Sequence, residues 1–89
     1  MIARWLEDSD RIVTTLWVVY ERPLDYPDGF VIRAHYVVRD TQGRTLTAVA
    51  RVAHCVGPTL ESVRRLLPPG LHPLGRMPND EPQIVEVWI

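Results

Sequence analysis

The stretch of sequence that decides the fold is residues 29–56, GFVIRAHYVVRDTQGRTLTAVARVAHCV. Apolar side chains alternate with other side chains on both sides of the turn-forming residues 40–43, and this is the period of a β-strand. The register that puts both apolar sets on the same face has Tyr36 opposite Ala48. It leaves a short loop in which Gly43 can take the left-handed conformation of a bulged hairpin turn. The predicted strands are residues 30–39 and 45–56.

Three further elements follow from local patterns. Residues 14–22 are rich in β-branched and aromatic types, which predicts a strand. Thr59 can cap a short helix over residues 60–67, which the next two prolines end. Residues 83–89 alternate again and predict a last strand. This strand can pair beside the 14–22 strand in either direction.

We therefore expect a single α+β domain over residues 14–89, preceded by an N-terminal lead-in over residues 1–13. The expected architecture is an antiparallel β-sheet in the order β-β-β-α-β, with one short helix on one face. The lead-in is expected to form one or two helical turns or a frayed tail. The residues expected to be buried together are Tyr36, Val38, Ala48, Ala50, Val52, Val63 and Leu67.

Composition narrows the class of protein. The chain has 89 residues, a hydrophobic fraction of 46% and a formal net charge of −1, so it is not a bulk polyanion binder. All ten basic residues are arginine, which we interpret as codon bias in a GC-rich bacterial genome. Cys55 is the only cysteine, which favours a reducing, cytoplasmic location. No apolar run approaches the ~20 residues of a membrane span, and no secretory signal is expected at the N-terminus.

The non-core face of the predicted hairpin carries arginines and a histidine. In the expected register Arg33 lies opposite Arg51, an unfavourable pair that Glu21 and Glu86 on neighbouring strands can neutralise. His35 shares this face. Two tryptophans are expected on faces that a single helix does not cover. They are Trp17 and Trp88.

This face has three competing interpretations. It is a solvated surface with cross-strand ion pairs, or a protein-binding or homodimer surface in which Trp17, Trp88 and the arginines are contact residues. It can also stack the bases of a single-stranded nucleic acid. The near-neutral charge argues against nucleic acid.

Other chemistry is weakly indicated. The histidines at 35, 54 and 72 lack metal-ligand spacing, so neither a metal nor a cofactor is predicted. His54 and Cys55 are adjacent on a strand and point to opposite faces, so they cannot form a nucleophile–base pair. Proline-rich loops supply further candidate binding residues, because function concentrates in loops. They are Asp25, Tyr26 and Arg76.

Two strings carry a resemblance that covers nearly the whole chain after residue 14. They are W-x-V-Y-x-R-P-x-D-Y-P-x-x-F-V-x-R from Trp17 to Arg33 and L-P-P-G-L-x-x-L-x-R-x-P-x-D-x-P-x-I-V-E-V-W-I from Leu67 to Ile89. Together they resemble a family of small bacterial proteins with no assigned function. The resemblance implies a free-standing domain of bacterial origin, and it carries no activity, cofactor or catalytic residue.

The sequence thus favours a non-enzymatic protein-interaction or self-associating module. Two alternatives stay open. The first is a small ligand-binding or enzymatic domain that uses the proline-rich loops and His35. The second is a nucleic-acid-associated accessory protein.

Overall fold

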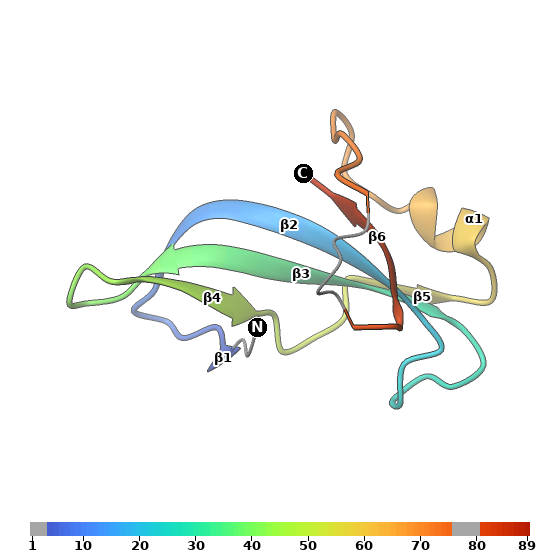
Figure 1. The fold of residues 1–89 in the computed structure, drawn as a ribbon, viewed down its shortest axis with the longest axis horizontal. Coiled ribbons are helices and arrows are strands. Elements are labelled where there is room, and N and C mark those ends of the chain that lie inside the picture. The colour runs from blue at the N-terminus through green and yellow to red at the C-terminus, as the bar shows by residue number, and fades with distance from the viewer. Residues whose placement is uncertain (1–3, 76–80) are drawn as a thin grey trace.

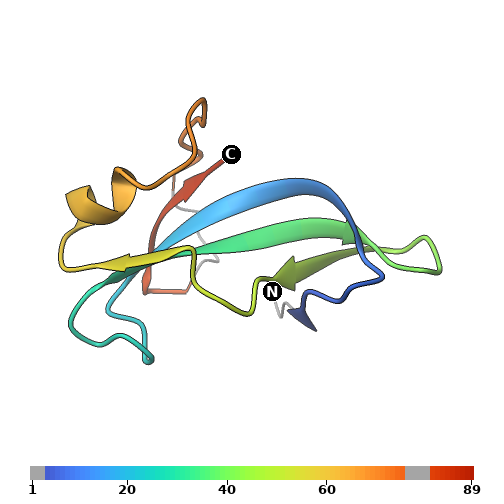
Figure 2. The same cartoon turned by 180° about the vertical axis from the view of Figure 1, so that it is seen from behind.

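The computed structural model describes residues 4–75 and 81–89. Within these residues the elements are β1 (Arg4–Trp5), β2 (Arg11–Glu21), β3 (Phe30–Arg39), β4 (Thr45–Val49), β5 (Cys55–Gly57), α1 (Leu60–Arg64) and β6 (Ile84–Trp88). The sheet has the order β1-β4-β3-β2-β6, and β5 pairs with β3. Figure 1 shows α1 on one face of the sheet, near β5 and β6, and Figure 2 shows the same arrangement from behind. We call this face the helix face.

A small sheet with one short helix fits the expected α+β class, but the expected order β-β-β-α-β is not matched. One strand is added at the N-terminus, and one predicted strand is broken in two. The sheet is also mixed, because β1 runs parallel to β4 whereas the other pairs are antiparallel.

The hairpin at the centre of the sheet has the predicted register. Tyr36 pairs with Ala48 across β3 and β4. Gly43 has φ of 77°, and its N–H donates to the carbonyl of Asp40 at 3.1 Å. The Asp40 carboxylate accepts the backbone N–H groups of Gln42 and Arg44. The Asp40 side chain therefore stabilises the turn, as is common for aspartate in turns.

The strand predicted over residues 45–56 is wrong beyond Val49. The chain bends after β4 and pairs with β3 again as β5, in a shifted register that puts Val56 opposite Val31. Arg33 lies at the break and donates to the carbonyls of Ala50 and Arg51, both at 3.2 Å. As a result, Val52 is 78% exposed and not in the core.

The helical turn or frayed tail expected near the N-terminus is wrong for the described residues there. β1 adds to the edge of β4, with Trp5 beside Val49, and the N–H of Leu6 donates to the Val49 carbonyl at 2.9 Å. Arg4 is held by both carboxylate oxygens of Asp10, at 2.8 and 2.5 Å. This bidentate pair stabilises a strand that is too short to persist alone.

The last strand, β6, pairs antiparallel with β2, which answers the question that the sequence leaves open. Trp17 lies beside Trp88 and Val18 beside Val87, but Tyr20 pairs with Ile84 after a register shift. The shift is a β-bulge, and an extra residue moves the next side chain to the other face. Ile84 therefore joins Val18 and Val87 on the face opposite the helix.

The core has one cluster on each side of the sheet. On the helix face, Val19, Ile32 and Val63 are fully buried, and α1 supplies Val63. Val18, Ile84 and Val87 form the second cluster on the opposite face. Of the expected core, Val38, Ala48 and Val63 are buried, Tyr36, Ala50 and Leu67 are half-buried, and Val52 is exposed.

The helix begins as predicted and ends early. The Thr59 hydroxyl accepts the N–H of Ser62, and the Ser62 hydroxyl accepts the N–H of Thr59, which is a reciprocal cap. The helix ends at Arg64 and not at Leu67. In the part of the chain that the structure describes, no helix combines the length and the apolar character needed to cross a membrane.

We predict that Ile32→Ala lowers the free energy of unfolding by about 2–5 kcal/mol, because it leaves a cavity in a fully buried cluster. Val52→Ala is the control, and it should change stability by less than about 0.5 kcal/mol because Val52 is exposed. Urea denaturation followed by circular dichroism measures both. Equal effects of the two substitutions would contradict this description of the core.

Candidate functional site

The structure separates the residues that the sequence expectation placed on one face. Trp17 pairs with Ala34 and Trp88, and both tryptophans pack against the helix-face cluster. The His54 ring meets Trp17 edge-on at 4.8 Å. Arg33 and His35 lie on the face opposite the helix, because strand neighbours alternate. A common face for the tryptophans and Arg33 is therefore wrong.

The partners expected for Arg33 and Arg51 are also different in the structure. Arg51 lies in the bend after β4 and not opposite Arg33. Glu86 does not neutralise Arg33, because its carboxylate binds the guanidinium of Arg64 and accepts the indole N–H of Trp88 at 3.3 Å. The Arg64 guanidinium holds the pKa of Glu86 below its usual range. The acidic partner of Arg33 is instead Asp25, at 3.0 Å.

Arg33 is fixed on three sides. Besides Asp25, its guanidinium donates to the carbonyls of Ala50 and Arg51, and its side chain is only 16% exposed. It thereby connects the loop between β2 and β3 to the bend between β4 and β5. A planar guanidinium with several fixed donors suits such a junction.

A hollow of about 260 Å³ opens beside Arg33 on the face opposite the helix. Trp5, from β1, is 50% exposed in its wall, and the Arg51 guanidinium lies 5.7 Å from its ring centre. Aromatic and arginine side chains in contact form a cation–π pair. We call this feature the Trp5 hollow. Its lining residues are Trp5, Tyr20, Pro23, Asp25, Val31, Arg33 and Val49.

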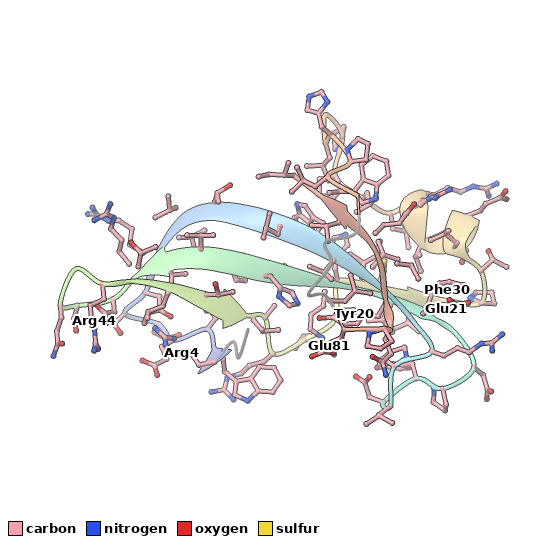
Figure 3. The ribbon with its side chains drawn as sticks, viewed as in Figure 1. Arg4, Tyr20, Glu21, Phe30, Arg44 and Glu81 are labelled. Carbon is pink, nitrogen blue, oxygen red and sulfur yellow. The ribbon has the colours of Figure 1, made fainter. Side chains whose placement is uncertain are left out.

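Tyr20 brings a hydrogen bond to the edge of the Trp5 hollow. Its hydroxyl lies 2.7 Å from Nε2 of His35, and the two rings are tilted with centroids 6.1 Å apart. Figure 3 shows Tyr20 on the side of the sheet away from α1. His35, which the sequence singled out, is therefore linked to this hollow through Tyr20.

A second, larger hollow lies at the same end of the molecule, between the loop that joins β2 to β3 and the β5 segment. Its volume is about 420 Å³. Asp25 borders both hollows, so the Asp25–Arg33 ion pair lies between them. We call this feature the Tyr26 hollow. Its lining residues are Asp25, Tyr26, Pro27, Asp28, Gly29, Val56, Gly57 and Pro58.

Three further predictions from the sequence concern Arg76, metal binding and Cys55. Arg76 falls outside the described residues, so its predicted binding role has no structural counterpart here. Within residues 4–75 and 81–89, the structure contains no group of three or more His, Cys, Asp and Glu side chains arranged to hold a metal ion. Cys55 packs against the helix-face cluster, where burial raises the pKa of its thiol.

Trp5 is the residue that sequence reasoning missed. It lies in a segment that has no strand pattern of its own, and it is placed by β1 pairing with β4 and by the Arg4–Asp10 ion pair. The signal was the tryptophan itself in the N-terminal lead-in, since tryptophan is enriched in protein contacts.

Asp10, which pairs with Arg4 next to Trp5, has a lowered pKa. The Arg4 guanidinium and the backbone N–H of Glu7 lower the pKa of Asp10 to about 2. Its side chain is 1% exposed. A depressed pKa means that the ionised carboxylate is the form that holds β1 in place.

The chain matches no protein-family model, and searches of curated proteins and of solved structures found no significant match.

We predict that Arg33→Ala lowers the free energy of unfolding by about 1–2 kcal/mol, because it removes a largely buried donor from two carbonyls and a carboxylate. Arg44→Ala is the matched control: Arg44 is 65% exposed and pairs with Asp40 in the hairpin turn, so its loss should have the smaller effect. Thermal denaturation compares the two. A smaller effect of Arg33→Ala than of Arg44→Ala would contradict the proposed junction.

We predict that β1 detaches in acid. Asp10 has a pKa of about 2 in the folded protein, against 3.8 as its ordinary value, so its contribution is complete above 3.8 and is lost as the pH falls through about 2. Amide hydrogen exchange at Leu6, which donates to β4, should accelerate across that window. Asp10→Asn should show fast exchange at neutral pH already. Unchanged protection of Leu6 in this variant would contradict the assignment.

Proposed function

We propose that the protein is a non-enzymatic protein-binding module of the bacterial cytoplasm, and that the Trp5 hollow is its contact surface. The observation that carries the proposal is the exposed Trp5–Arg51 pair beside the fixed Arg33–Asp25 ion pair. An all-arginine basic set and a free cysteine support the bacterial and reducing setting.

The residue types of the hollow support a protein partner. Tryptophan, tyrosine and arginine dominate the energetic centres of protein interfaces, particularly where a central pocket excludes water. Trp5 offers a half-exposed ring, and the half-buried Tyr20 and Val49 supply further apolar lining. A partner side chain entering the hollow would gain apolar burial against these groups.

The rigidity of the hollow supports the same proposal. Arg33 is held by three acceptors, and Trp5 is held by strand pairing and by the Arg4–Asp10 bond. A preformed contact surface loses little conformational entropy when it binds, so its contacts contribute more fully to affinity.

The charge of the hollow favours an acidic partner group. Asp25 neutralises the charge of Arg33. The guanidinium of Arg51, which lies over the Trp5 ring, therefore leaves a positive charge at the edge of the hollow. A carboxylate in a partner can pair with Arg51 while an apolar neighbour covers the ring. We therefore propose a segment with an acidic residue next to a large apolar one.

A second candidate, a small-ligand site, is favoured by one observation. The Tyr20 hydroxyl and His35 share a hydrogen bond of 2.7 Å at the edge of the Trp5 hollow, and histidine is the usual group for proton transfer near neutral pH. Small-molecule fragments that shift the NMR resonances of both residues, and that lose affinity in Tyr20→Phe, would favour this candidate over a protein partner.

We predict that Trp5→Ala weakens binding to peptides selected from a displayed random library by about 30-fold or more, the size expected when a hot-spot residue is truncated. Leu66→Ala is the control, because Leu66 is comparably exposed, at 56%, and follows α1 on the helix face. Fluorescence titration with the synthetic peptides measures both. Affinities unchanged in Trp5→Ala and in Arg51→Ala would remove the Trp5 hollow as the contact surface.

A further inference from the structure

The loop of residues 22–29, which joins β2 to β3, presents an apolar side chain to solvent. Leu24 is 97% exposed, the highest value among the large exposed hydrophobic residues of the described chain. Figure 1 shows this loop, coloured cyan to turquoise, projecting from the end of the sheet near β5. Single exposed apolar residues are common, so the exposure needs a second observation before it bears on function.

The second observation is that this loop is held in one conformation. The N–H of Arg22 donates to the Gly29 carbonyl at 2.8 Å, and that of Tyr26 donates to the Pro23 carbonyl at 3.0 Å. Asp25 is bound to Arg33. The loop also lies close against β5, since a Cβ atom added at Gly29 would lie 2.9 Å from the Gly57 carbonyl oxygen.

Backbone strain accompanies this order. Arg22 has φ of 49°, the only positive φ at a residue other than glycine in the part of the chain that the structure describes. Such a conformation is unfavourable for a residue with a Cβ atom, and it persists only where surrounding contacts enforce it. The loop thus combines a strained backbone conformation at Arg22, hydrogen bonds and an ion pair that hold it in place, and a fully exposed leucine.

A complementary hollow lies on the same loop. The Tyr26 hollow is bordered by the ring of Tyr26, which is 39% exposed, and by Val56, which is 44% exposed. Its volume is about 420 Å³ and it is open to solvent, so a leucine side chain can enter it from outside. Leu24 precedes by one residue the first residue that lines this hollow, Asp25.

We propose that two copies of the chain associate through this loop, with Leu24 of each copy inserted into the Tyr26 hollow of the other. A protrusion and a recess on one patch are what a two-fold symmetric contact requires, because each copy then offers both. The proposal rests on the proposed function in treating the chain as an interaction module, but it uses a different surface.

The charges of the patch suit a second copy. Arg33 neutralises Asp25, which leaves Arg22 and Asp28 as the charged residues of the loop, with opposite signs. In a two-fold contact Arg22 of one copy can face Asp28 of the other, so like charges do not oppose each other. One loop and one short strand form a small patch, which fits a weak, concentration-dependent dimer.

The test is sedimentation velocity of the wild-type chain and of Leu24→Asp, over a concentration series up to about 1 mM. We expect the wild type to dimerise and Leu24→Asp to raise the dimer dissociation constant by about tenfold or more, with an unchanged melting temperature. Val56→Arg, which fills the recess, should have the same effect. Leu66→Asp is the control for an added charge at an exposed leucine and should leave the dimer intact.

A wild type that stays monomeric up to about 1 mM would overturn the dimer, since any dimer dissociation constant would then exceed that concentration. A dimer that persists unchanged in both Leu24→Asp and Val56→Arg would overturn the contact. Neither result bears on peptide binding at the Trp5 hollow. That binding is measured separately and depends on Trp5.

Discussion

The contacts of Arg33 are the constraint on which the rest of this structure depends. One guanidinium binds the carboxylate of Asp25 and the carbonyls of Ala50 and Arg51. It therefore sets where β4 ends, where the loop between β2 and β3 lies, and how the two hollows are divided. A lysine offers a single ammonium group and cannot span three acceptors in one plane.

The hairpin was predictable because two local signals agreed. The alternation of apolar residues and the glycine at the turn both required Tyr36 opposite Ala48, and the structure has that pair. The break after Val49 was not predictable, because apolar residues continue to alternate through Val52, as they would in an unbroken strand. The break depends on Arg33, which reaches it from another strand, and no local pattern records such a contact.

The candidate site was less predictable than the fold, for a related reason. The loop of residues 22–29 is too long to fix β2 against β3 by itself, so the sequence does not say which face of β2 carries Trp17. The tryptophans were assigned to the wrong side as a result. The structure places Arg33 and Arg51 at the Trp5 hollow and links His35 to it through Tyr20, but Trp5 itself is placed by a parallel pairing between segments more than forty residues apart.

The short strand β1 gives the molecule a way to adjust affinity without changing a contact residue. Two residues and one buried carboxylate hold Trp5 at the hollow, so loss of the Arg4–Asp10 pair would let this segment open while the β2–β3 ribbon stays folded. A partner that needs Trp5 binds only the fraction of molecules in which β1 is docked, and its apparent dissociation constant is the intrinsic value divided by that fraction. Substitutions at Arg4 or Asp10, which do not line the Trp5 hollow, would then set the strength of binding.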